Sequence, residues 1–125
     1  MFAKADQFAR RETMEIRNYK DLEVAQTPHG INAYKLYDTD HALIMHLHLK
    51  AGESLKAHIT PVDVAFYILE GTPTILVGDE KVEVTKDDIV ESPKDIVHCI
   101  YNDSEEDVRV LVMKLPKPTA KTIMV

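Results

Sequence analysis

The sequence of 125 residues contains one cysteine, Cys99, and it lacks any apolar run as long as a signal peptide or a membrane span. A lone cysteine cannot form a disulfide within the chain. The N-terminal stretch carries charges throughout, which also differs from a secretory signal. We therefore expect a cytoplasmic protein that has no membrane partner.

Positive charge is in the minority, because 15 lysines and arginines stand against 21 aspartates and glutamates and give a net charge of −6. A nucleic-acid-binding domain would need a basic face, so a nucleic-acid partner is not expected. The sequence also has no glycine-rich phosphate loop, no Gly-x-Ser-x-Gly elbow and no Cys-x2-Cys pair. These motif classes therefore assign no function.

The length corresponds to one domain that can bury a core without disulfides or a structural metal. No internal repeat or linker divides it. We distinguish an N-terminal segment (1–14), a single barrel (15–115) and a C-terminal tail (116–125). In the first segment a short helix is expected, and in the tail Thr122–Val125 is expected to add an edge strand or to dock on a partner subunit. The apolar face of that helix would consist of Phe2, Ala5, Phe8 and Ala9.

From about Met14 onward, short runs of β-branched and aromatic residues alternate with turns. A turn recurs about every eight to twelve residues, which is typical of an all-β sandwich or barrel. The sequence Val77-Gly78-Asp79-Glu80 predicts a hairpin loop. The strands predicted most clearly are Ile31–Tyr37, Ala42–Leu49, Val64–Leu69, Thr74–Val77, Lys81–Thr85 and Val108–Leu115.

One strand carries two histidines at alternate positions. In Ala42–Leu49, the even-numbered His46 and His48 share one face, and the leucines and Met45 share the other. The two histidines could form a paired metal site, or they could lie on the outer face of the barrel, at a subunit contact or in solvent. The apolar face is the one that a barrel interior would take, so we place His46 and His48 outside.

Two other strands are apolar on both faces. In Val64–Leu69 and in Val108–Leu115, both the even-numbered and the odd-numbered positions are largely apolar. Such a strand is buried on both sides, as when the outer face of a sheet packs on a second subunit. The sequence therefore predicts a homodimer.

Two stretches resemble the motifs of the cupin family. Gly52-x5-His58-x-Thr60-x10-Gly71 resembles the first motif, Gly-x5-His-x-His-x3-4-Glu-x6-Gly. Asp87-x5-Pro93-x-Asp95-x2-His98-x3-Asn102 resembles the second, Gly-x5-Pro-x-Gly-x2-His-x3-Asn. The resemblance implies a small cupin, an all-β jelly-roll barrel (double-stranded β-helix) with a ligand pocket inside. We expect His58 and His98 to face each other across this barrel.

The first motif is degenerate at the positions that hold metal in the family. The resemblance implies three histidines and one glutamate, and the matching positions here hold His58, Thr60, Val64 and His98. Divalent transition metals prefer three or more protein ligands. Asp63 could replace the missing glutamate only if a local bulge turned it inward, because it precedes that position by one residue. One divalent transition metal or none is therefore expected.

Four further positions within the second motif do not suggest a site. Asp87 and Asp95 replace glycines, and aspartate tolerates a left-handed backbone, so the turns should persist. Asn102 is expected to close a turn through its side chain. Cys99 follows His98, so it should point away from the interior as a structural thiol.

Two functions agree with these residues. The first is the binding of a small molecule in a largely apolar pocket, without metal or with histidine acid–base chemistry. The second is a metal-dependent enzyme of oxygenase or isomerase type, in which His58 and His98 are the core ligands and Asp63, Thr60 or water completes the set. The predicted pocket residues are Met45, His58, Thr60, Val64, Phe66, Ile68 and His98.

Overall fold

The computed structural model describes residues 12–125. The helix expected from Phe2, Ala5, Phe8 and Ala9 falls outside this part of the chain. The first element within it is the short 3-10 helix η1 (Tyr19–Asp21), which the Asn18 side chain caps by accepting a hydrogen bond from the backbone N–H of Lys20. No helix in residues 12–125 is long and apolar enough to cross a membrane.

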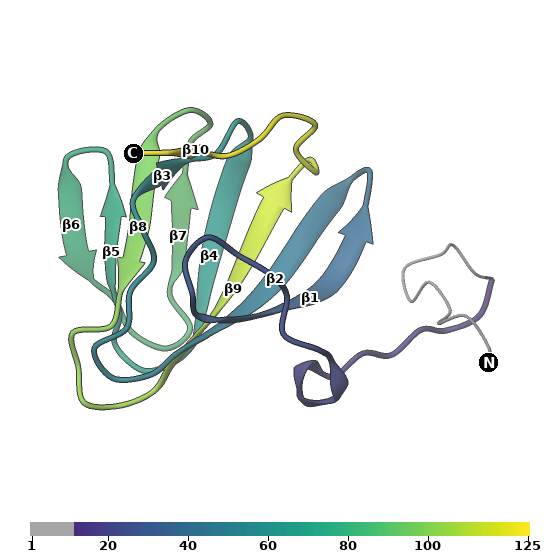
Figure 1. Cartoon of the computed structure of the whole chain (residues 1–125), viewed down its shortest axis with the longest axis horizontal. Coiled ribbons are helices and arrows are strands. Elements are labelled where there is room, and N and C mark those ends of the chain that lie inside the picture. The colour runs from purple at the N-terminus through teal and green to yellow at the C-terminus, as the bar shows by residue number, and fades with distance from the viewer. Residues whose placement is uncertain (1–11) are drawn as a thin grey trace.

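Ten strands in the described residues form two five-stranded antiparallel sheets (Figure 1). The strand order is β1-β2-β9-β4-β7 in the first sheet and β10-β3-β8-β5-β6 in the second. The strands are β1 (Asn32–Thr39), β2 (Ala42–Leu49), β3 (His58–Ile59), β4 (Asp63–Glu70), β5 (Thr74–Val77), β6 (Glu80–Glu83), β7 (Ile89–Ser92), β8 (Val97–Tyr101), β9 (Val108–Leu115) and β10 (Ile123–Met124).

From β3 onward the chain passes repeatedly between the two sheets. Strands β3, β5, β6 and β8 belong to the second sheet, whereas β4, β7 and β9 belong to the first. This winding is that of a jelly roll, so the predicted all-β double-stranded β-helix is confirmed. The tail adds β10 beside β3, where Met124 pairs with His58. Of the two alternatives for the tail, it therefore takes the edge strand.

The space between the sheets is filled by the inward-facing side chains of alternating strand positions. Phe66 and Ile68 of β4 and Leu49 of β2 are fully buried there. Burying a side chain of this size stabilises the fold by about 1.5–3 kcal/mol. The apolar face predicted for β2 builds the core, and so does one of the two apolar faces of β4 and of β9, whereas the other face of each is only partly buried within this chain.

The motif turns keep their shape although two glycines are replaced. Asp87 and Asp95 both adopt the left-handed backbone, with φ of 73° and 64°. Gly71 is a stricter requirement, because a Cβ at this position would lie 2.6 Å from the carbonyl oxygen of Asp107. Asn102 closes its turn as predicted, donating from Nδ2 to the carbonyl oxygens of Leu49 and Glu106. The loops of the second motif are therefore held by the side-chain hydrogen bonds of Asn102, and two of their turns use the left-handed backbone of aspartate.

Candidate functional site

A cavity of about 390 Å³ lies inside the barrel. Strands β2, β4 and β9 supply its apolar wall, β3 and β8 supply two histidines, and the segment before β1 supplies a third. Its lining residues are Ala25, Gln26, Thr27, Pro28, His29, Ala33, Lys35, Leu43, Met45, Leu47, Leu55, His58, Phe66, His98, Val112, Lys114 and Thr122.

His58 and His98 are neighbours within one sheet and do not face each other across the barrel, so that expectation was wrong. Strand β3 pairs directly with β8, and His58 and His98 are register partners. Their Nε2 atoms lie 3.0 Å apart, and the rings meet edge to face. Strand β3 has only two residues and thus gives no periodic signal in the sequence, which is why its pairing was not predicted.

A chain of hydrogen bonds fixes the protons of these two histidines. A carbonyl oxygen only accepts, so Nδ1 of His58 donates to the backbone oxygen of Lys56 at 2.7 Å. Neutral His58 therefore accepts at Nε2, and Nε2 of His98 donates to it. Nδ1 of His98 then accepts from the Ser92 hydroxyl at 2.7 Å. The buried Thr60 Oγ1 lies 3.0 Å from Nε2 of His98 and shares its proton.

His29 is the third histidine of the cavity, and together with His58 and His98 it forms what we call the inner histidine cluster. It lies in the Thr27-Pro28-His29-Gly30 turn, and its ring centroid is 4.6 Å from that of His58. Its Nδ1 accepts a hydrogen bond from the backbone N–H of Lys56 at 2.9 Å. From the sequence His29 was predicted only as part of a turn, because a turn residue has no periodicity that would show where its side chain points.

Lys114 is a second residue that the sequence analysis missed. It lies at the end of β9, half-buried, and lines the cavity. A signal for it existed, because Val108, Val110 and Val112 are the inward positions of β9 and Lys114 continues their alternation. A lysine at the inner end of an apolar strand face is thus recognisable from sequence.

The inner histidines are held in their neutral form. Burial lowers the pKa of His29 to about 4 and that of His98 to about 3, and the charges of neighbouring His58 and Lys114 lower both further. Burial also lowers the pKa of His58, although its hydrogen bond to Lys56 opposes the shift. Burial lowers the pKa of Lys114 as well. Near neutral pH the cluster therefore offers neutral imidazoles.

The structure brings most of the predicted pocket residues together. Met45, Phe66, His58 and His98 line the cavity, and Thr60 stands behind His98 as a hydrogen-bond partner. Val64 and Ile68 face inward from β4, but they are packed in the core and are not part of the lining. Val64, Phe66 and Ile68 share the inward face of β4. The alternation pattern therefore cannot tell which of them reaches the cavity.

Asp63 lies apart from the histidines. Its Oδ1 accepts a hydrogen bond from the backbone N–H of Lys94 at 2.9 Å, and its side chain is exposed. Its register is regular, since Asp63 pairs with Leu115 and the irregularity in the β4–β9 pairing falls at Ile68/Glu70 instead. The bulge that would turn this carboxylate inward is therefore missing, and Asp63 does not line the cavity.

The donor set does not complete a divalent-metal site. Two ligands of a metal with bonds of about 2.0–2.1 Å lie about 3.0–3.4 Å apart, so His58 and His98 could supply two nitrogens. His29 could bind a metal through Nε2 only with a proton on Nδ1, where the Lys56 N–H already donates. In residues 12–125 no group of three or more histidine, cysteine, aspartate or glutamate side chains is placed to hold a metal.

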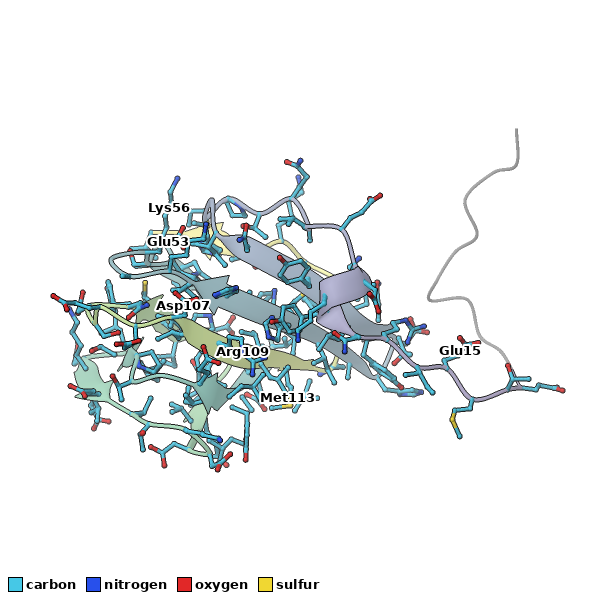
Figure 2. All side chains as sticks on the ribbon, turned by 90° about the horizontal axis from the view of Figure 1, so that it is seen from below. Glu15, Glu53, Lys56, Asp107, Arg109 and Met113 are labelled. Atoms are coloured by element: carbon cyan, nitrogen blue, oxygen red, sulfur yellow. The ribbon has the colours of Figure 1, made fainter. Side chains whose placement is uncertain are left out.

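The outer face of the first sheet carries a second group of residues, the outer cluster, which consists of Tyr19, His46, His48, Asp107 and Arg109. His46 and His48 lie on the outer face, as the alternation predicted. Yet His46 is buried, because the Tyr19 ring of η1 stacks on it at 3.9 Å. Arg109 donates from Nη1 to His46 Nε2 at 3.1 Å, and Asp107 pairs with His48 at 3.0 Å. Figure 2 labels Asp107 and Arg109.

Cys99 is also placed as a structural residue. Its side chain is buried, and its Sγ lies 3.3 Å from the carbonyl oxygen of Leu55. Burial raises the pKa of the thiol, which keeps it protonated and unreactive. It takes no part in the cavity lining.

A barrel of two antiparallel sheets with histidines from β3 and β8 inside it defines a double-stranded β-helix protein with an internal pocket. The family profile of the cupin domain matches residues 45–114, which is more than half of the chain. The chain belongs to the cupin family. The comparison with curated proteins gave no match.

Several solved structures share this fold. The Thermus thermophilus protein TT1209 is similar, with a TM-score of 0.72, 25% identity and coverage of 84% of this chain and 100% of that one. A cupin family protein from Methanocaldococcus jannaschii has a TM-score of 0.67, 25% identity and coverage of 83% and 94%. The polyketide cyclase RemF from Streptomyces resistomycificus has a TM-score of 0.78, 19% identity and coverage of 90% and 86%, and this likeness shows the fold alone.

Proposed function

We propose that this cupin binds a small organic molecule in the barrel cavity without a resident metal. The observation that carries the proposal is the cavity itself, about 390 Å³ in volume, with an apolar wall and three convergent histidines. Ligand sites in proteins combine these features, a mostly apolar concave surface and a few placed polar groups. The volume lies at the small end of such sites, so the ligand is small.

The histidines would orient the ligand and exchange protons with it. Nε2 of His29 can donate to a ligand directly, because its Nδ1 already accepts from Lys56. The ring nitrogens of His58 and His98 are engaged with protein partners, so they meet a ligand only when it displaces one of these hydrogen bonds. Proton transfer by this cluster would make the protein a metal-free acid–base catalyst. Binding is the part of this proposal that the cavity supports most directly.

Replacement of Phe66 by leucine tests the cavity. Phe66 lines it and is buried, and leucine keeps the position apolar while widening the space. A fragment screen by ligand-observed NMR on the unaltered protein would supply the probe. We expect the variant to change the affinity of a cavity ligand at least about fivefold, with or without EDTA, since the loss of well-packed contacts costs about 1 kcal/mol or more.

The matched control is Leu115→Ala on the outward end of β9, where the side chain is 45% exposed. It should leave the affinity unchanged. An affinity that Phe66→Leu does not move would place the ligand outside the barrel and contradict the proposal.

A metal-dependent enzyme, of oxygenase or isomerase type, is the second candidate. One observation favours it, because the Nε2 atoms of His58 and His98 have the spacing of two metal ligands and both Nδ1 atoms are held by oxygen partners. Elemental analysis of untagged protein, purified without chelator, distinguishes the two. A near-stoichiometric divalent transition metal that is lost in His98→Ala would support the enzyme, and an empty site after metal soaking would exclude it.

We also propose that the protein is a homodimer in the cytoplasm. The outer face of the first sheet is largely apolar where Met113 and Leu111 of β9 pair with Ala65 and Tyr67 of β4, and this surface supports a sheet-face contact. Met113, labelled in Figure 2, is suited to the test. Met113→Glu should convert a dimer to a monomer in light scattering, and an unaltered mass for this variant would contradict the contact.

A further inference from the structure

The inner end of β9 places a cation against the apolar wall of the cavity. Lys114 lines the cavity, and its strand neighbours in the two adjacent strands are Leu43 and Val64. Within residues 12–125 its ammonium group makes no hydrogen bond and no ion pair. A half-buried charge without a partner costs free energy, so such groups are normally paired.

The rest of the lining offers this charge no carboxylate. Among the described residues, no aspartate or glutamate lines the cavity, although acidic residues outnumber basic ones by six over the whole chain. The other lysine of the lining, Lys35, has its Nζ 3.2 Å from a carboxylate oxygen of Asp38. Lys114 is therefore the cation of this cavity that lacks an anion.

The histidines do not supply the missing charge, but they can supply hydrogen bonds. His29, His58 and His98 are neutral near neutral pH, so they neither repel nor neutralise an anion strongly. His29 has its Nδ1 occupied as an acceptor, so its proton is on Nε2 and available for donation. An anionic oxygen in the cavity would thus meet one cation and at least one neutral donor.

The rest of the cavity wall is apolar, so a ligand that fits it needs an apolar part in addition to its anionic group. Aliphatic and aromatic side chains cover most of the wall and have no polar atoms to offer; they are Leu43, Met45, Leu47, Leu55, Phe66 and Val112. A small inorganic anion would leave these side chains facing empty space or water.

We propose that the cavity binds a small organic carboxylate, with its anionic group on Lys114 and its apolar body against Phe66. This inference rests on the proposed function, that the cavity is a small-molecule site, and names the chemical class of the ligand. It also accounts for the incomplete metal site, since a lysine cation beside His58 and His98 opposes the binding of a divalent cation between them.

Two matched pairs of probes test the charge separately from the shape. Benzoate is compared with benzyl alcohol, and cyclohexanecarboxylate with cyclohexylmethanol, by isothermal titration calorimetry near neutral pH. The unaltered protein should bind each carboxylate about tenfold to a hundredfold more tightly than its alcohol, because a hydrogen bond to a charged group contributes about 1.5–3 kcal/mol. Lys114→Met should abolish this preference, so that each carboxylate binds no more tightly than its alcohol.

The matched control is Lys50→Met, which removes the same charge from an exposed position outside the cavity and should keep the preference. Equal affinities for acid and alcohol, or a preference that survives in Lys114→Met, would overturn the carboxylate assignment and leave small-molecule binding intact. If neither member of either pair binds at about 10 mM, a weaker interaction than about 3 kcal/mol, the cavity proposal fails as well.

Discussion

The two faces of the first sheet place a cation in contrasting surroundings. On the outer face, Arg109 contacts His46, and its Nε lies 3.4 Å from a carboxylate oxygen of Glu70. On the inner face, Lys114 projects from the same strand and lines a cavity whose described lining contains no carboxylate. The charged groups of the outer face are paired within the chain, although the buried Nδ1 of His46 has no hydrogen-bond partner among the described residues. The inner groups leave a charge unmatched, and an unmatched buried charge points to a ligand.

The largest effect that this comparison predicts is the loss of stability in acid. The folded-state pKa is about 4 for His29 and His46 and about 3 for His98, below the ordinary value of 6.5. The unfolded chain therefore takes up protons first as the pH falls. Their contribution to stability is complete above about pH 6.5 and is lost as the pH falls through 4 and then 3, by several kcal/mol in total.

Urea unfolding at neutral pH and near pH 4.5 measures this loss. His46→Gln should remove the outer face's contribution to the pH dependence of the free energy of unfolding. His98→Gln should remove the contribution of the cavity. A urea midpoint that stays constant over this range would show that the histidines are not buried in their neutral form.

Arg109→Met is expected to have the next largest effect. The variant removes the donor to the buried His46 Nε2 and leaves this nitrogen without its partner. We expect the free energy of unfolding to fall by about 1–2 kcal/mol near neutral pH. The loss of the Arg109 charge should also raise the pKa of His46, because that charge helps to lower it. A two-dimensional NMR titration of the imidazole signals would detect the pKa change, and urea unfolding the loss of stability.

Lys114→Met should change stability in the opposite direction. The substitution replaces an unpaired cation by an apolar side chain of similar length at a half-buried position. We expect the protein without ligand to gain about 1 kcal/mol, measured by urea unfolding beside Arg109→Met. A loss of stability would mean that Lys114 stabilises the folded protein, as Arg109 does. The contrast between a structural outer cation and a ligand-binding inner cation on β9 would then be contradicted.

His48→Gln should have the smallest effect. The pair of His48 and Asp107 is at the surface, where the Asp107 side chain is 53% exposed. Exposed ion pairs contribute about 0.5 kcal/mol or less. Thermal unfolding at low and high salt should hardly distinguish this variant from the unaltered protein, and a loss comparable to that of Arg109→Met would assign His48 a structural role that its exposure does not suggest.

Several strands were predictable because each is a run of apolar and β-branched residues bounded by turn residues, and in β2 the residues also alternate with a period of two. The bounds of β2, β5 and β9 agree with Ala42–Leu49, Thr74–Val77 and Val108–Leu115 as predicted. The same alternation placed His46 and His48 outside and would have placed Lys114 inside. The turns at Asp87 and Asp95 were also predictable from the sequence, because aspartate tolerates the positive φ that both residues adopt.

The residues that were missed depend on contacts between distant segments. Nothing around His29 or Tyr19 indicates that one ring reaches the cavity and the other covers His46. The pairing of β3 with β8 likewise involves two residues of each strand, too few for any pattern. Such contacts are set by how the barrel closes, and they became visible only in the three-dimensional structure.

A chain of hydrogen bonds runs from Ser92 through His98 and His58 to Lys56, and all of its donors point the same way. Hydrogen points from the Ser92 hydroxyl to His98, from His98 to His58, and from His58 to the carbonyl oxygen of Lys56. The dipoles add head to tail, and the carbonyl at the end forbids the reverse order. The two histidines are thus opposite tautomers, one protonated on Nδ1 and the other on Nε2. All four ring nitrogens of His58 and His98 are engaged in hydrogen bonds. A proton or a ligand can therefore bind to one of these nitrogens only by breaking one of the hydrogen bonds.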